Sequence, residues 1–170
     1  MESNNSRLSI EPLLISLALL LFLAIVIKSQ FNTIIPLSQS APDNVFSAER
    51  AFLMLEHLIH EQAPHPVDSK ANRVVEGRLI SLLQNMGYQA EIQESKICND
   101  SSPESTYCTQ VRNIIVRISG AQPNKGILLS AHYDSAAASP GGSDAGAAVG
   151  TLLETARLLS SLPQQRNTII

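Results

Sequence analysis

The chain of 170 residues has no tryptophan, and three tyrosines and four phenylalanines supply all of its aromatic side chains. This scarcity argues against a surface on which sugars or nucleic-acid bases stack. The net charge is −3 with no long run of one sign, so the basic stripe that a nucleic-acid partner requires is missing. A hydrophobic fraction of 44% and this length are typical of a single domain with a buried core.

Cysteine is also scarce, since Cys98 and Cys108 are the only two in the chain. Their spacing is not that of a C-x-x-C zinc pair, and no second pair completes such a site. The residues between them are polar and rich in serine, so the two thiols can close this loop as a disulfide in an oxidising compartment. Two free thiols are the alternative interpretation.

Charge is absent from the stretch 12–27, which is apolar throughout except for one serine. Its 16 residues are fewer than the roughly 20 that cross a bilayer as a helix, but Lys28 can extend to the membrane surface. A cleaved signal peptide is disfavoured because the first small-residue pattern, Ser38-Gln39-Ser40, lies far beyond this stretch. A buried globular helix would have a polar face. We therefore predict a transmembrane signal anchor at 12–28.

The charges that flank this anchor, Arg7 and Lys28, are balanced and do not orient it by themselves. The short polar N-terminus and the cysteine pair favour a C-terminal domain on the exported side, which is periplasmic, lumenal or extracellular. The predicted organisation is a tail at 1–11, the anchor in contact with membrane lipid at 12–28, a stem linker at 29–46 and one domain at 47–170.

Hydrophobic periodicity predicts alternating helices and strands after the stem. Helices are expected at 47–62, 69–86 and 145–161, and strands at 88–93, 111–118, 126–131 and 166–170. The strand at 126–131 is a continuous apolar run, which is typical of a central strand buried on both faces. The predicted fold class is therefore α/β, with a mixed sheet flanked by helices. Because the last strand only opens at Ile170, we expect this sheet to be incomplete.

The candidate chemistry follows the strand at 126–131. His132 stands at the carboxyl end of that strand, where open α/β sheets bind their ligands. Asp134 lies two residues on, where its carboxylate can orient the imidazole and strengthen it as a metal ligand. Asp144 follows after a loop and precedes a helix, whose N-terminal dipole favours a carboxylate. These residues predict a metal site, although Asp144 can also be explained as a helix N-cap alone.

The same stretch resembles the zinc exopeptidases of the aminopeptidase Y type, particularly their membrane-bound vacuolar and endoplasmic-reticulum relatives. Those proteins share a strand that ends in His-x-Asp-Ser, a Pro-Gly-rich loop, and an Asp before a helix with Leu-Leu-Glu. The residues that match this pattern are His132, Asp134, Ser135, Pro140, Gly141, Asp144 and Leu152-Leu153-Glu154. Further upstream matches extend the resemblance to roughly 48–170, among them His65-Pro66, Asn72-Arg73-Val74, Gly87-Tyr88 and Val111-Arg112-Asn113-Ile114.

The resemblance implies a zinc-exopeptidase fold with a two-zinc site. His132 would bind one zinc ion, Asp144 would bridge both, and Asp134 would orient His132 and act as a catalytic residue. The complete site also needs a Glu-Glu pair, an Asp and a His, all of which would lie after Ile170. We therefore expect this chain to be the N-terminal part of the enzyme, inactive and poorly folded by itself.

The implied function is that of a membrane-anchored zinc metallo-exopeptidase, an aminopeptidase that hydrolyses N-terminal residues from peptide substrates. One alternative is a non-catalytic ectodomain of the same fold that serves as a binding or scaffold module. The other is a single-zinc acyltransferase of the glutaminyl-cyclase kind.

Four other features are interpreted without a catalytic role. His57 and His60 are expected at the surface, and Ser135 has no sequence partners for a catalytic triad. Glu154 and Arg157, three residues apart in a helix, are expected to form a solvated pair. The GxxxG spacing at 146–150 lies too close to these charges for a membrane helix.

Overall fold

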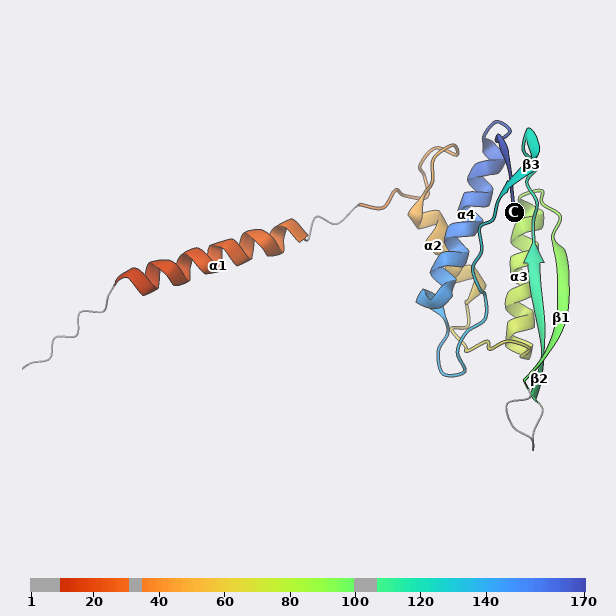
Figure 1. Ribbon diagram of the computed structural model, residues 1–170, viewed down its shortest axis with the longest axis horizontal. Coiled ribbons are helices and arrows are strands. Elements are labelled where there is room, and N and C mark those ends of the chain that lie inside the picture. Colours follow the sequence, from red (N-terminus) through yellow and green to blue (C-terminus); the bar gives the residue numbers. More distant parts are fainter. Residues whose placement is uncertain (1–9, 31–34, 100–106) are drawn as a thin grey trace, which may run out of the picture. The chain divides into compact units, whose positions relative to one another are not determined.

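The computed structural model describes residues 10–30, 35–99 and 107–170. The chain divides into two compact units, Met1–Ile35 and Pro36–Ile170 (Figure 1). Within the described residues of the first unit, helix α1 spans Ile10–Gln30, which corresponds to about 30 Å of length. Its stretch 10–29 has a mean hydropathy of 2.7 and buries none of its side chains. By length and composition α1 can therefore cross a membrane.

The helices α2, Ala48–Leu58, and α3, Lys70–Asn85, begin where serine residues cap them. Each capping hydroxyl accepts a hydrogen bond from the backbone N–H three residues on, at Ser47 and at Ser69, which satisfies a donor that the first helical turn leaves free. α2 ends four residues before the predicted boundary. The end of α3 is followed by Gly87, whose φ of +86° is the left-handed conformation that stops a helix.

The strands form two separate two-stranded sheets within the described residues. β1, Glu91–Asn99, pairs antiparallel with β2, Tyr107–Ile115, and β3, Gln122–Ile127, pairs parallel with β4, Asn167–Ile169. The helices that follow α1 and both sheets occupy the second unit (Figure 1). The predicted α/β class with parallel and antiparallel strands is therefore present, but the strands are not joined into the single sheet that we expected.

The predicted strand at 126–131 is the main difference. β3 begins earlier and ends at Ile127, and Leu128 and Leu129 are 71% and 41% exposed. Pairing with the C-terminal residues continues to the N–H of Leu129, which donates to the carbonyl of Ile170. Among the described residues, β4 is the only strand that pairs with the segment 126–131. The expectation of a strand buried on both faces is wrong here. Burial of both faces needs other elements packed against each of them.

The core lies between α2, α3 and α4, which spans Ala147–Ser161. Its buried residues are Leu58, Val75, Leu79, Leu83, Val149 and Leu153. α2 and α4 lie side by side (Figure 1). A Cβ built on Gly150 would come within 2.5 Å of the carbonyl oxygen of Ala51. The GxxxG spacing therefore allows two helices of a folded domain to approach closely.

Glu154 lies in this helix contact and is fully buried, contrary to the solvated pair that we expected. Its carboxylate accepts hydrogen bonds from the N–H of Ser47 at 2.9 Å, from Arg50 Nε at 3.0 Å and from Arg157 Nε at 2.6 Å. Burial alone would raise the pKa of Glu154, but these donors outweigh it and lower that pKa. The carboxylate therefore joins α4 to the start of α2.

The two arginines of this cluster also hold the segment 36–46. The Arg50 guanidinium donates to the carbonyls of Gln39, Ala41 and Val45, and Arg157 donates to the carbonyl of Asp43. This segment was predicted as a stem between anchor and domain. Its backbone is bound to the domain through buried or half-buried side chains.

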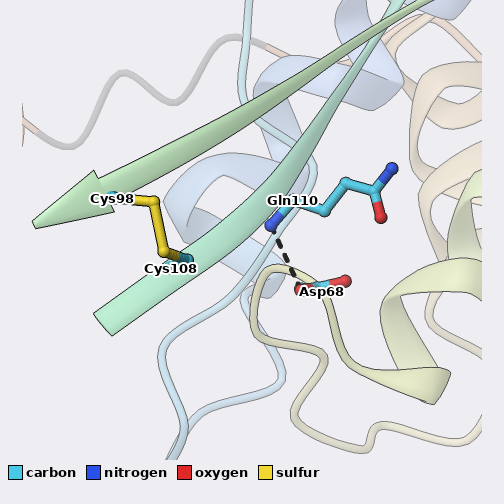
Figure 2. Close-up of a disulfide and its surroundings, with 4 residues drawn as sticks. All are labelled: Asp68, Cys98, Cys108 and Gln110. Carbon is cyan, nitrogen blue, oxygen red and sulfur yellow. Dashed lines mark hydrogen bonds between the residues drawn. A yellow bond between two sulfur atoms is a disulfide. The ribbon is translucent and has the colours of Figure 1, made fainter. Parts of the chain in front are cut away.

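The hairpin of β1 and β2 carries the two cysteines. Cys98 and Cys108 are directly opposite each other in the register and are joined as a disulfide (Figure 2). Near it, the backbone N–H of Gln110 donates to the carboxylate of Asp68 at 3.1 Å, the dashed line of Figure 2. The hairpin is thus closed by a covalent bond near its tip and attached to the loop before α3.

Candidate metal centre

The three candidate residues lie in the connection between β3 and α4. His132 and Asp134 follow the end of β3, and Asp144 lies in the short turn Gly142–Gly146 directly before α4. The side chains of His132 and Asp134 are 52% and 41% exposed, and that of Asp144 is 91% exposed. A metal ion or a substrate can therefore reach all three.

Asp134 contacts the Nδ1 side of the His132 ring. Nδ1 is 3.1 Å from the backbone carbonyl oxygen of Asp134 and 3.3 Å from its Oδ1. Since a carbonyl oxygen only accepts hydrogen bonds, the geometry requires that Nδ1 carry a proton. In a neutral ring the lone pair is then on Nε2, which is the arrangement of a histidine prepared to bind a metal.

Asp144 faces the other nitrogen. His132 Nε2 is 3.0 Å from Asp144 Oδ1. A lone pair directed at a carboxylate would be repelled, so this contact is favourable only with a cation between the two atoms. A proton shared by the two atoms makes the contact favourable, and the hydrogen bond to Asp144 raises the pKa of His132. His132 Nε2 and Asp144 Oδ1 therefore lie close enough to serve together as a nitrogen ligand and an oxygen ligand of one metal ion.

These donors fit zinc, which binds imidazole nitrogen and carboxylate oxygen, but they supply only part of its usual shell of three or four protein ligands. In the part of the chain that the structure describes, no group of three or more His, Cys, Asp or Glu side chains gathers to hold a metal ion. His57 and His60 are exposed, as predicted. The described residues therefore contain two converging ligands and one orienting carboxylate.

A cavity of about 640 Å³ opens beside His132 and Asp134. Its wall is mostly apolar and comes from α3, β2, the stretch after β3, and α4, with Leu79, Ile114 and Leu152 among the lining residues. Its lining also includes buried core residues of α3 and α4, so the cavity is an opening of the hydrophobic core beside His132.

Tyr133 fixes the chain between His132 and Asp134, a role that the sequence pattern did not predict. Its hydroxyl donates to the carbonyl of Arg112 in β2 at 2.9 Å. Burial, with the nearby Glu76 carboxylate, raises the pKa of Tyr133 to about 12, so the hydroxyl keeps its proton. Glu76 in turn accepts hydrogen bonds from Arg112 and Arg73.

The connection between β3 and α4 lies within a match to a known protein family. Residues 113–170 match Peptidase family M28, a range that includes all three candidate residues. The match identifies residues 113–170 as a segment of the peptidase family M28 type. Proteins of this family are generally zinc-dependent, which agrees with the nitrogen and oxygen donors at His132 and Asp144.

Curated M28 relatives extend the match upstream. The chain is 36% identical over 112 residues to the vacuolar membrane protease of Schizophyllum commune, covering 62% of this chain and 12% of that protein. It is 33% identical over 123 residues to the vacuolar membrane protease of Candida albicans strain SC5314, covering 72% and 14%. The chain thus spans about an eighth of the length of these relatives.

Solved structures support the M28 fold. A glutaminyl cyclase from Porphyromonas gingivalis superimposes with a TM-score of 0.60 and 26% identity, over 75% of this chain and 44% of that one. A leucine aminopeptidase precursor from Bacteroides thetaiotaomicron superimposes with a TM-score of 0.59 and 24% identity, over 73% and 46%. At the latter identity the likeness bears on the fold alone.

Proposed function

We propose that this protein is a membrane-anchored zinc metallo-exopeptidase, an aminopeptidase that removes N-terminal residues from peptides. The observation that carries the proposal is the convergence of His132 Nε2 and Asp144 Oδ1 at 3.0 Å within the range that matches Peptidase family M28. Relatives named as membrane proteases support it.

In this proposal His132 and Asp144 would be the residues of this chain that hold zinc. Zinc supplies a Lewis acid that polarises the scissile carbonyl and lowers the pKa of water. Asp134 acts as the orienting carboxylate, because its contacts at Nδ1 hold the ring so that Nε2 faces the metal.

We also propose that α1 anchors the protein in a membrane and that the domain lies on the exported side. The length and apolar surface of α1 support the first point. The Cys98–Cys108 disulfide supports the second, because such bonds persist in lumenal, periplasmic or extracellular compartments and are rare in the cytosol. Contact with lipid is assigned to residues 12–28.

The test is hydrolysis of aminoacyl-nitroanilides by the full-length gene product purified in detergent. We expect activity that a chelator abolishes and zinc restores, and that fails on substrates with a blocked N-terminus. Asp144→Asn should lose activity and Glu56→Gln, an exposed change on α2, should retain it. A purified, folded and zinc-loaded protein without aminopeptidase activity contradicts the proposal.

A glutaminyl cyclase activity is the second candidate, because solved structures that superimpose on this chain include glutaminyl cyclases. A peptide with N-terminal glutamine separates the two reactions in one mass spectrum. An aminopeptidase releases free glutamine and a shortened peptide, whereas a cyclase releases ammonia and leaves the peptide length unchanged. A scaffold without catalysis would leave the peptide intact.

A further inference from the structure

Ser135 directly follows Asp134, yet it has no place among the proposed zinc ligands. The residue is 5% exposed. Its hydroxyl accepts a hydrogen bond from the backbone N–H of His65 at 2.7 Å and donates to the carbonyl of Ala136 at 3.0 Å. A nucleophilic serine needs a base that takes its proton, and a carbonyl cannot do so. The hydroxyl is therefore placed to hold backbone.

The first piece of backbone that it holds is the loop before α3. Ser135 and His65 are joined twice, since the N–H of Ser135 also donates to the carbonyl of His65 at 3.2 Å. The same carbonyl accepts from the side chain of Asn72 at 3.3 Å. Asn72 is buried in the first turns of α3, next to its Ser69 cap. The chain that presents His132 is thus fastened to a rigid helix.

The second piece is the loop that carries Asp144. Gly141 has a φ of +70°, and a Cβ built on it would lie 2.8 Å from the Cβ of Ser135 and 3.3 Å from the carbonyl oxygen of Asp144. The carbonyl of Gly141 accepts a hydrogen bond from the N–H of Gly146 at the start of α4. Ser135 therefore holds the His65 loop through hydrogen bonds, and it leaves no room for a side chain at Gly141 in the loop that carries Asp144.

We propose that Ser135 is a positioning residue that sets the separation of His132 and Asp144, and hence the zinc affinity of the site. The inference rests on the proposed zinc function. Ser135 acts through hydrogen bonds to the His65 loop and through its close packing against Gly141, without contact to metal or substrate. Changes to residues that orient metal ligands typically cost about 10–100-fold in metal affinity.

The experiment measures zinc affinity of the full-length protein in detergent by competition with a chromophoric chelator, together with its melting temperature. Ser135→Ala removes the acceptor for the His65 N–H and should weaken zinc binding about 10–100-fold. Ser135→Thr keeps the hydroxyl and should restore most of that loss. Gly141→Ala places a methyl group against the Cβ of Ser135, which forces the two loops apart and should weaken binding although the Ser135 hydroxyl is kept.

Two controls separate positioning from general destabilisation. Ser95→Ala changes an exposed serine of β1 and should leave zinc affinity unchanged. Gly150→Ala disturbs the contact of α2 with α4 and should lower the melting temperature while the zinc affinity of the folded protein stays within a factor of about two. If Gly150→Ala weakens zinc binding as much as Ser135→Ala, the effect of Ser135 is only structural and the inference fails.

Failure of the inference and failure of the proposed function give different results. Wild-type affinity in Ser135→Ala, with zinc binding lost in Asp144→Asn, overturns the role of Ser135 and leaves the zinc function in place. Absence of zinc binding in the folded wild-type protein overturns both. Weakened binding in Ser135→Ala and Gly141→Ala, with both controls unchanged in affinity, supports the inference.

Discussion

At the scale of single residues, zinc binding at the proposed site depends on the protonation of His132. The hydrogen bond to Asp144 raises the pKa of His132 above its usual value of about 6.5. A raised pKa means that the folded state favours the proton. Its stabilising contribution is therefore complete below the unfolded pKa and is lost as pH rises through the folded value.

The first prediction is that zinc affinity depends on pH with a midpoint above 6.5, because zinc and the Nε2 proton compete for one lone pair. Below that midpoint the affinity should fall about tenfold per pH unit. Chelator competition from pH 5.5 to 8.5 measures it, with His57→Gln, an exposed change, as the control. A midpoint at or below the ordinary histidine value would show that Asp144 does not hold this ring.

Glu154 is the residue on which the second prediction rests. It is fully buried and forms ion pairs with Arg50 and Arg157. Glu154→Gln leaves two arginines without their carboxylate, so the free energy of unfolding should fall by about 3–5 kcal/mol. Urea denaturation at pH 7 measures this loss, and Glu56→Gln, which is exposed, should cost less than about 0.5 kcal/mol.

The stability of the wild-type protein and of Glu154→Gln should also depend differently on pH. Because the pKa of Glu154 is lowered, its contribution is present above the unfolded value of about 4.3 and is lost as pH falls through the folded value. Stability of the wild-type protein should therefore decline more steeply than that of Glu154→Gln on acidification below about pH 4.3. Parallel declines would mean that the carboxylate is not ionised in the folded state.

At the scale of elements, the approach of α4 to α2 depends on glycine. A Cβ at position 150 would lie 2.5 Å from the carbonyl oxygen of Ala51 and 3.3 Å from the Cβ of Leu55. The third prediction is that Gly150→Ala lowers the free energy of unfolding by about 1–3 kcal/mol, because the helices must separate. Thermal or urea denaturation measures the change.

The matched control is Gly77→Ala in α3. A Cβ at Gly77 meets nothing within 4 Å, and alanine in a helix interior is more favourable than glycine by about 0.5–1 kcal/mol. Gly77→Ala should therefore stabilise the protein while Gly150→Ala destabilises it. Equal effects of the two substitutions would refute a packing origin.

At the scale of the whole molecule, the hairpin disulfide reports the compartment of the domain. The fourth prediction is that Cys98 and Cys108 are unreactive towards an alkylating reagent in native membranes and become reactive only after reduction. Mass spectrometry of the peptides that contain them measures the modification. Alkylation of both thiols before reduction would place the domain in a reducing compartment and contradict the proposed exported side.

The anchoring of the segment 36–46 also belongs to this scale, because Arg157, which is more than a hundred positions away in the chain, helps to hold it. Arg50 and Arg157 bind its carbonyls. The fifth prediction is that Arg50→Ala speeds hydrogen–deuterium exchange across this segment, whereas Lys70→Ala, an exposed change, does not. Unchanged exchange in Arg50→Ala would show that the hydrogen bonds of Arg50 do not hold this segment.

Local features could be predicted from the sequence because their causes are local. An uncharged apolar run specifies α1, serine caps specify the starts of α2 and α3, and the His132-x-Asp134 spacing brings a carboxylate to the imidazole. In each case the interacting groups lie within a few residues of one another. Periodicity and capping rules describe that range.

Only the tertiary structure decided the burial of Glu154, the role of Ser135 and the exposure of Leu128. Glu154 meets Ser47 across 107 positions, and Ser135 meets His65 across 70. The pattern of a single chain does not reveal which distant donors will surround a carboxylate or a hydroxyl. In the same way, the burial of an apolar strand depends on which other elements pack against it, and its own sequence does not specify them.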